Sequence, residues 1–160
     1  MASRVTRATQ ALDRAGAVYR LHAYQVAEKV GEGYGEAVAD AIGMPRSRVF
    51  KTLVAVVDGD PLVAVLPVDR RLSTKRMAST AGGKSCTLAS PETAERVTGY
   101  VTGGISPFGL RRELRLVLDE SAYELETIAV SGGRRGIQIE LSPETVIAVT
   151  GGMLAPIAEV

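Results

Sequence analysis

The sequence predicts a single α/β domain in which a mixed, largely antiparallel sheet is flanked by helices. Three observations favour this fold class. Helical and β-hairpin patterns alternate irregularly, whereas a doubly wound parallel sheet would need a regular strand–helix repeat. The 160 residues suffice for one domain with a sizeable core, and no linker divides residues 1–160. Hydrophobic residues make up 46% and charged residues 23% of the chain, as in folded globular proteins.

The first quarter of the chain predicts two helices and one strand. Apolar residues recur at helical spacing over 5–15, which predicts an amphipathic helix. Residues 18–24 are rich in β-forming residue types and predict a strand. The glycine-rich stretch 28–35 predicts a loop, which leads into a short helix over 36–42 that ends at a glycine.

The strongest strand signal is the near-continuous apolar run over 49–57, which predicts a strand buried on both faces. An Asp-Gly-Asp turn then predicts a hairpin with a second strand over 62–67. Lys51 is anomalous because it places a cation near the start of a core strand. Burying an unpaired ammonium group is unfavourable, so we expect Lys51 to face a cleft or an anion. The alternative is a lysine that snorkels from the strand edge to solvent.

The rest of the chain predicts further short strands and helices. The letters SPET occur at both Ser90 and Ser142, where serine would cap a helix and proline would occupy its first position. A glycine-rich segment with two arginines joins the strands of a late hairpin. The predicted elements are a helix over 73–81, a strand around Cys86, a helix from Ser90, strands over 114–118, 127–131 and 137–141, a helix over 143–149 and an apolar tail over 153–160.

The stretch from Tyr100 to Gly109, read as YVTGGISPFG, contains three glycines and a proline and cannot form a regular helix. Apolar flanks would anchor it to the core. One interpretation is the floor of a binding or catalytic pocket, where backbone N–H groups approach a ligand without a Cβ in the way. The other is an ordinary tight connection between two strands.

Charge and hydropathy restrict the classes of function. The net charge is only +1, although basic residues cluster within 46–51, 70–76, 111–115 and 134–135. These clusters could hold a polyanion if they converge in space, and otherwise they are solvated loop ends and helix faces. No apolar run is long enough to cross a bilayer, and the N-terminal stretch lacks the apolar centre of a signal peptide. We therefore expect a soluble cytoplasmic protein without a membrane partner.

The usual sets of catalytic residues are missing. The single cysteine, Cys86, and single histidine, His22, exclude an internal disulfide and a Cys/His zinc cluster within the chain, and neither has an evident catalytic partner. P-loop, GxGxxG and isolated carboxylate-pair patterns are absent as well. What remains is the glycine loop, Lys51 and hydroxyl groups at Tyr24, Thr52, Ser106 and Ser131. Such a site could polarise a carbonyl and position a substrate, with water or the substrate itself as the nucleophile.

Three ordered motifs carry a resemblance to a known family. VFKTLV around Lys51, then TGYVTGGISPFG, then VSGGRRGIQIEL together resemble the bacterial Cys-tRNA(Pro) deacylases (YbaK/EbsC-like). These are relatives of the editing domain inserted in bacterial prolyl-tRNA synthetases. The resemblance runs from the first helix to Pro143. It implies a partly barrel-like sheet and a free-standing hydrolase, without metal or cofactor, that removes cysteine mischarged onto proline tRNA.

The resemblance also implies roles for individual residues. Lys51 would be the hallmark residue that contacts the terminal ribose and phosphate of the tRNA, and the amides of Gly103 and Gly104 would stabilise the oxyanion. The cysteinyl thiol would attack its own ester carbonyl, which agrees with the lack of an enzyme nucleophile. The residues implied to bind the substrate are Tyr24, Phe50, Thr52, Ile105, Ser106, Pro107, Ser131 and Gln138.

The chain departs from the family pattern at two places. Gln138 stands where some relatives carry aspartate, and Arg111 and Arg112 stand where lysines are common. Related subfamilies remove alanine or other small amino acids. One methylene in a small apolar pocket is worth only about 1–3 kcal/mol, so the preferred amino acid stays open.

Two other classes of function also stay open. One is a non-catalytic module that binds tRNA or the synthetase, and the other is a hydrolase of small acyl esters. We expect tRNA as a partner and hypothesise an association with prolyl-tRNA synthetase, because the nearly neutral domain has little electrostatic hold on tRNA. Both a monomer and a homodimer are compatible with the sequence.

Overall fold

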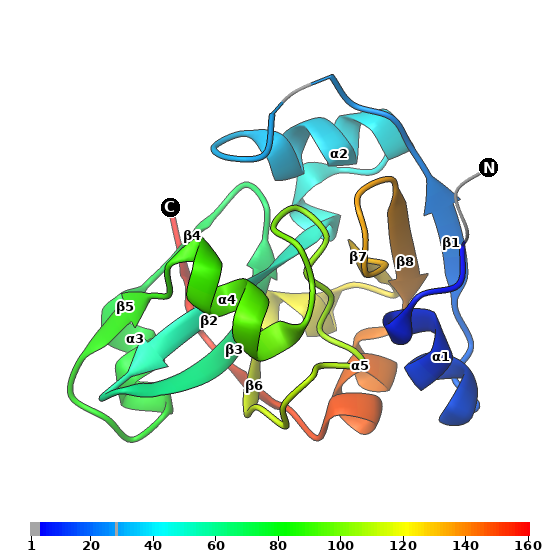
Figure 1. Cartoon of the computed structure of the whole chain (residues 1–160). Helices are drawn as coiled ribbons and strands as arrows, with labels where there is room; N and C mark the ends of the chain where they lie inside the picture. The colour runs from blue at the N-terminus through cyan, green and yellow to red at the C-terminus, as the bar shows by residue number, and fades with distance from the viewer. Residues whose placement is uncertain (1–3, 28) are drawn as a thin grey trace.

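The computed structural model describes residues 4–27 and 29–160, which form two main sheets with helices packed around them (Figure 1). The helices are α1 (Arg7–Arg14), α2 (Tyr34–Ile42), α3 (Thr74–Thr80), α4 (Pro91–Thr98) and α5 (Pro143–Thr150), with 3-10 turns η1 (Arg46–Arg48) and η2 (Glu120–Glu124). The strands are β1 (Arg20–Ala23), β2 (Phe50–Val57), β3 (Asp60–Pro67), β4 (Arg71–Leu72), β5 (Cys86–Leu88), β6 (Leu116–Asp119), β7 (Ile128–Ser131), β8 (Ile137–Leu141), β9 (Met153–Ala155) and β10 (Ala158–Glu159). The predicted mixed α/β class is confirmed.

The larger sheet has the strand order β5-β2-β3-β6-β9 and combines both kinds of pairing. β2 pairs antiparallel with β3 and β5, whereas β6 lies parallel to β3 and β9. Asp58 and Gly59 join β2 to β3 with φ angles of 48° and 88°, the left-handed values of a type I′ turn. This tight hairpin fixes the register of β2 and places Lys51 opposite Leu66.

The smaller sheet, β1-β8-β7, is antiparallel throughout and meets the larger one near the start of β2. A parallel bridge between Val49 and Ala129 makes this connection. The expectation of a partly barrel-like sheet needs correction, because over residues 4–27 and 29–160 the strands do not close and β1 and β9 stay at sheet edges. β5 pairs only with residues 55–57, so the first half of β2 has an open edge.

β3 separates the interior into two apolar layers. Val63 and Val65 belong to the cluster formed with α1, β7, β8 and α5, whereas Leu62 and Leu66 belong to the cluster formed with α3. β3 is therefore buried on both faces. The same prediction for residues 49–57 is only partly correct, since Lys51 is half-buried at the open edge of β2.

The helix ends follow the predicted capping chemistry, with one shift. The side chain of Ser90 accepts a hydrogen bond from the N–H of Thr93 at 3.2 Å, and Ser142 does the same for Thr145 at 3.1 Å. α2 begins at Tyr34, before the predicted residue 36, because Gly33 adopts a left-handed conformation with φ 83° that ends the loop. The early start brings Tyr34 to the mouth of the open edge of β2.

Candidate active site

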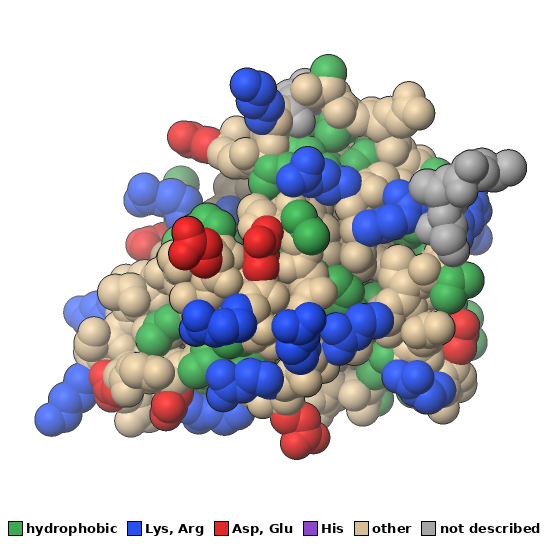
Figure 2. All heavy atoms as spheres, in the orientation of Figure 1, with side chains coloured by type: hydrophobic (Ala, Val, Ile, Leu, Met, Phe, Trp, Pro, Cys, Tyr) green, Lys and Arg blue, Asp and Glu red, His purple; other side chains and the backbone are tan. Residues whose placement is uncertain are grey.

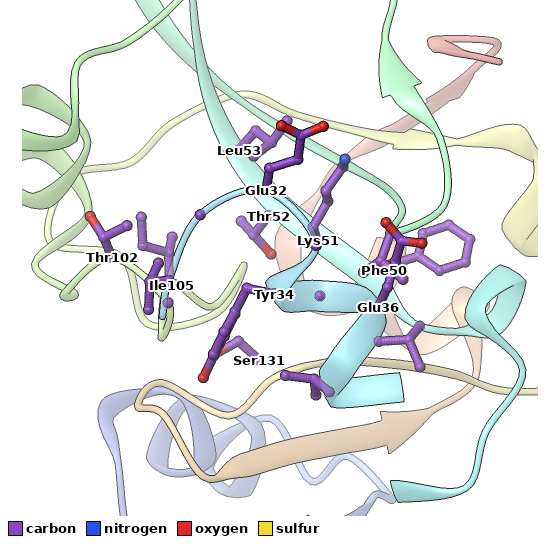
Figure 3. A pocket seen from close by; sticks show the side chains of 18 of the residues that line it. Glu32, Tyr34, Glu36, Phe50, Lys51, Thr52, Leu53, Thr102, Ile105 and Ser131 are labelled. Atoms are coloured by element: carbon purple, nitrogen blue, oxygen red, sulfur yellow. The ribbon is translucent and has the colours of Figure 1, made fainter. Parts of the chain in front are cut away.

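A cavity of about 580 Å³ lies at the open edge of β2 (Figure 3). Its walls come from the start of α2, the turn after β3, the segment from β5 to α4, the loop 99–109 and the hairpin of β7 and β8. The predicted site residues that line it are Phe50, Lys51, Thr52, Gly103, Ile105, Ser131 and Gln138. Three motifs that are distant in sequence therefore meet at one cavity.

Lys51 extends from β2 and lines the cavity as a half-buried side chain, which confirms the expectation that it faces a cleft (Figure 3). Burial lowers the pKa of its ammonium group, and the carboxylates of Glu36 and Asp69 oppose that shift. The guanidinium group of Arg46 binds Glu36 at 2.9 Å, and in the described part of the chain Lys51 forms no ion pair. A partly buried cation in this state is suited to hold an anionic group of a ligand.

Two buried polar side chains of the cavity have an atom without a hydrogen-bond partner among residues 4–27 and 29–160. Thr52 is 9% exposed and Gln138 is 6% exposed. The unpaired atoms are Thr52 Oγ1 and Gln138 Oε1, and both residues line the cavity. An unsatisfied buried polar group is unfavourable by about 1–3 kcal/mol. These two groups therefore point to a ligand that forms hydrogen bonds.

Tyr34, the first residue of α2, lines the cavity, and its hydroxyl group lies next to that of Tyr24. The two hydroxyl oxygens are 3.4 Å apart. Burial, followed by the hydrogen bond with Tyr24, raises the pKa of Tyr34. The Tyr34 hydroxyl is therefore protonated at neutral pH and can donate. Tyr24 is not among the lining residues, so the residue implied by the resemblance reaches the site only through Tyr34.

The loop 99–109 is held in place by side chains on both sides. The carboxylate of Glu95 in α4 accepts hydrogen bonds from the N–H and the hydroxyl of Thr102, at 2.8 and 2.9 Å. From the β7–β8 hairpin, the guanidinium group of Arg135 donates to the Thr102 carbonyl at 3.1 and 3.3 Å. Beneath them, the hydroxyl of Tyr100 donates to the carbonyl of Phe108. The loop is therefore a rigid wall, as the functional interpretation of the glycine stretch requires.

The backbone amides of this wall differ in their availability. The N–H of Gly104 donates to the carbonyl of Val101 at 2.8 Å, so the prediction that Gly104 supplies an oxyanion donor needs correction. The N–H groups of Gly103 and Ile105 have no acceptor within the described residues, and both residues line the cavity. The amide of Gly103 is therefore still available as the predicted oxyanion donor, and the amide of Ile105 is available as a second donor.

Three other predicted substrate-binding residues serve the core or the loop. The Phe50 side chain is 2% exposed and packs in the larger apolar cluster, so it contributes mainly the backbone of β2 to the cavity wall. Ser106 is fully buried, and its hydroxyl accepts from the N–H of Phe108 at 3.4 Å. Pro107 lines a shallow depression beside α1 and not the cavity. The corrections for Ser106 and Pro107 follow from the turn, which faces its second half toward the interior.

Comparison with known proteins decides the class of this site. The family model described as the aminoacyl-tRNA editing domain matches residues 33–148. The chain belongs to this family. It is an aminoacyl-tRNA deacylase, an enzyme that hydrolyses the ester between an amino acid and its tRNA. The three motifs that carried the resemblance all lie within the matched range.

Curated relatives of the editing domain differ in their named substrates. A protein of Enterococcus faecalis, provisionally named Cys-tRNA(Pro)/Cys-tRNA(Cys) deacylase EbsC, is 40% identical over 76% of this chain and 75% of its own. Escherichia coli strain K12 has a relative named multifunctional Ser/Thr-tRNA deacylase ProXp-y, which is 32% identical over 76% of this chain and 73% of its own. A proline–tRNA ligase of Geobacter metallireducens is 30% identical over 66% of this chain but 18% of its own.

Solved structures share the fold of the editing domain. The hypothetical protein APE2540 superposes with a TM-score of 0.85 at 28% identity and covers 96% of this chain and 100% of its own. A structure provisionally described as a trans-editing enzyme for prolyl-tRNA synthetase has a TM-score of 0.85 at 23% identity over 100% of this chain and 99% of its own. The editing-domain type of α/β fold is thus confirmed.

Sequence reasoning missed several residues of the editing domain's cavity. Tyr34 lies in the stretch that the sequence predicts as a loop, Glu36 is the predicted first residue of the helix, and Thr102 lies in the glycine loop, and all three line the cavity. A tyrosine between two glycines, in GYG over 33–35, was the available signal for a side chain presented at a turn. An apolar wall that includes Leu88 could not be recognised, because its members are scattered along the chain.

The single histidine and cysteine of the editing domain lie away from the cavity. His22 is bound to Glu140 at 2.7 Å, and burial raises the pKa of the Cys86 thiol. Neither residue lines the cavity. Among the described residues there is no group of three or more His, Cys, Asp or Glu side chains that could hold a metal ion, and no helix is long and apolar enough to cross a membrane.

Glu95→Gln is expected to loosen the wall of the cavity and to reduce kcat/KM about 3- to 10-fold at pH 7. The N–H and then the hydroxyl of Thr102 lower the pKa of Glu95 from its ordinary 4.5. A carboxylate with a lowered folded pKa stabilises the fold above its ordinary pKa and loses this contribution as pH falls through the folded value. The wild type should therefore unfold at a higher temperature than the variant at pH 7, and this difference should disappear in acid. Glu92→Gln, an exposed change on the same helix, is the control, and an equal loss of activity there would contradict the role of Glu95.

Proposed function

We propose that this editing domain hydrolyses the ester of mischarged Cys-tRNA(Pro) by substrate-assisted attack of the cysteinyl thiol. The observation that carries the proposal is the set of described residues that line the cavity, which offers groups to bind and polarise a substrate but includes neither cysteine nor histidine. A mechanism that takes its nucleophile from the substrate fits such a site. The relative from Enterococcus faecalis, with a name that specifies cysteinyl-tRNA, supports the choice of amino acid.

The proposed reaction proceeds in two steps, formation of a thiolactone and its hydrolysis. The cysteinyl sulfur attacks its own ester carbonyl, a C–S bond forms, the C–O bond to the ribose breaks, and the thiol proton passes to the departing ribose oxygen. Water then opens the resulting thiolactone to free cysteine. A reaction within one bound molecule avoids the entropic barrier of bringing a separate nucleophile, an effect worth as much as about 7–11 kcal/mol.

Five residues of the cavity have a defined task in this proposal. The free N–H groups of Gly103 and Ile105 would stabilise the negative charge that develops on the carbonyl oxygen. The ammonium group of Lys51 would hold the terminal ribose and phosphate. Thr52 and Gln138 would bind the polar groups of the aminoacyl moiety, since each has an unpaired buried oxygen. The cavity volume of about 580 Å³ falls within the usual range for sites that hold a small organic ligand.

Serine on the tRNA is a second candidate substrate. The relative from Escherichia coli is named for seryl and threonyl esters. The unpaired oxygens of Thr52 and Gln138 would also pair well with a substrate hydroxyl, which forms stronger hydrogen bonds than a thiol. A seryl ester would require water as the nucleophile, because a hydroxyl is a weaker nucleophile than a thiol.

Prolyl-tRNA synthetase is the proposed macromolecular partner besides tRNA. Two bacterial proline–tRNA ligases contain a segment related to this chain, so in those proteins the related segment is part of the same polypeptide as the synthetase. A separate editing domain would gain tRNA from that neighbour, because its own net charge of +1 gives a weak general attraction.

Incubation with a panel of tRNA(Pro) molecules charged with cysteine, alanine, serine or proline is expected to show fastest loss of the cysteinyl ester and sparing of the prolyl ester. The rate of deacylation under single-turnover conditions measures this directly. Slower turnover of the seryl than the cysteinyl ester, by about 10-fold or more, would follow from the loss of the thiol nucleophile. Equal rates for the two would contradict substrate assistance, and loss of free cysteine methyl ester at a similar rate would favour a general esterase.

A further inference from the structure

Arginine side chains gather on the face of the molecule formed by α4, the segment that follows the loop 99–109, the turn between β7 and β8, and α1 (Figure 2). We call this set the arginine band. Its members are all exposed and comprise Arg7, Arg14, Arg96, Arg111, Arg112 and Arg135. The net charge of the chain is only +1, yet arginines outnumber acidic residues over α1, α4 and the segment 110–115 taken together. The acidic residues on these elements are Asp13, Glu92, Glu95 and Glu113.

The centre of the arginine band is built around Gly99, the left-handed residue that ends α4. A Cβ atom at Gly99 would lie 2.4 Å from Nη1 of Arg7 and 3.4 Å from Nε of Arg111, so the two guanidinium groups meet over this glycine. The guanidinium carbon of Arg7 also lies 6.0 Å from the centre of the Tyr100 ring. The ring and the missing side chain therefore let two like charges lie close together, and an anion bound beside both would relieve their repulsion.

The arginine band forms no ion pair with a carboxylate in the described part of the chain. The arginines on the opposite rim of the cavity, in contrast, lie close to carboxylates. Arg46 binds Glu36 at 2.9 Å and Asp40 at 2.7 Å, and Arg70 lies beside Asp69 at the cavity wall. Apart from Arg135, which donates to the Thr102 carbonyl, the guanidinium groups of the band are thus available for a polyanion on the side of α4 and α1.

The arginine band begins at the cavity itself. Arg135 binds the carbonyl of Thr102, and Thr102 lines the cavity. At the centre, Arg111 lies next to the end of α4, where its N–H donates to the carbonyl of Thr98 at 2.9 Å. At the far end, Arg14 and Arg112 line one shallow depression. A nucleic-acid strand that leaves the cavity over Thr102 would therefore pass Arg135, then Arg111, and then Arg14 and Arg112.

We infer that the arginine band binds the phosphate backbone of the double-stranded acceptor stem while the 3′ end lies in the cavity. The inference rests on the proposed function, because it takes an aminoacylated tRNA as the ligand. Arginine binds phosphate with two parallel hydrogen bonds, and double-stranded RNA is recognised mostly by its shape and backbone. Such contacts would hold any acceptor stem, so they add affinity without selecting a tRNA sequence.

The test compares the double variant Arg7→Gln/Arg111→Gln with the control Arg20→Gln/Lys75→Gln, which loses the same charge at exposed positions of β1 and α3. Two substrates are used, Cys-tRNA(Pro) and the cysteinyl ester of the trinucleotide CCA. We expect the double variant to raise KM for the tRNA about 10-fold and leave the CCA ester unaffected. The salt dependence of log KM for the tRNA should fall by about two in slope, one for each lost phosphate contact. The control should match the wild type on both substrates.

Equal losses on both substrates would overturn the inference, since they would show damage to the cavity wall, and so would unchanged KM for the tRNA. Fluorescence anisotropy with an uncharged acceptor-stem RNA hairpin gives a readout that needs no catalysis. If the wild type hydrolyses neither ester, the proposed function fails, and weaker hairpin binding by the double variant still supports the arginine band. Unweakened hairpin binding overturns it. Arg111→Gln/Arg112→Gln repeats the test without Arg7, in case the contact with Tyr100 is needed for folding.

Discussion

Lys51→Met is expected to reduce kcat/KM for the cysteinyl ester about 100-fold or more while the protein stays folded, with an unchanged or higher unfolding temperature at pH 7. The loss of activity follows from the proposed contact with the terminal ribose and phosphate. The stability follows from burial, which lowers the pKa of Lys51 and so makes its ammonium group unfavourable in the folded state. Methionine fills a similar volume without a charge. Single-turnover deacylation and thermal unfolding measure the two effects.

The pH dependence of the same variant gives a second test. Between the lowered folded pKa of Lys51 and its ordinary value of 10.5, the unfolded chain binds more protons than the folded one. The stability of the wild type therefore rises with pH in this window, and its deficit against Lys51→Met should shrink there. Lys75→Met, an exposed change on α3, is the matched control and should alter neither property. A variant that unfolds at lower temperature would show that Lys51 has a structural role.

The sequence predicted the elements well where local chemistry decides them. Ser90 and Ser142 cap helices as expected, because a cap depends on the four residues that follow it. The prediction failed where packing between residues that are distant in the sequence decides the structure. The apolar run over 49–57 reads like a strand buried on both faces, yet the register of β5 leaves half of β2 open to the cavity. Hydrophobicity reports the average environment of a strand and not which edge has a neighbour.

The candidate site shows the same division. Motif order placed Lys51, Gly103 and Gln138 at one cavity, because the resemblance already contains the three-dimensional arrangement. The resemblance does not report how individual hydrogen bonds are used. That the amide of Gly104 is engaged by Val101 depends on the conformation of one turn, which sequence patterns do not fix. The unpaired oxygens of Thr52 and Gln138, which carry the argument for a ligand, were equally out of reach.

Position 104 requires glycine for a packing reason, and not because its amide serves as the predicted oxyanion donor. A Cβ there would lie 2.6 Å from Cα and 2.8 Å from the carbonyl carbon of Arg134, both backbone atoms that cannot turn aside. At Gly103 the Cβ would instead meet the side chains of Val30 and Arg135, although its φ of 92° adds strain. Gly104 is therefore needed for the close approach of the loop to the β7–β8 hairpin, and through it for the position of the oxyanion donors.

Gly104→Ala is expected to destabilise the protein by about 1–3 kcal/mol, the usual effect of an extra methyl group in a packed interior. Because the clash separates the loop from the hairpin, kcat/KM should also fall about 100-fold, the effect of a 1 Å misplacement of reacting groups. Gly151→Ala is the control, since its φ of 68° makes alanine strained but leaves open space around the new methyl group. It should lose about 1–2 kcal/mol of stability and keep its activity. Denaturant unfolding and single-turnover kinetics separate the two variants, and an active Gly104→Ala enzyme would show that the donors do not depend on this contact.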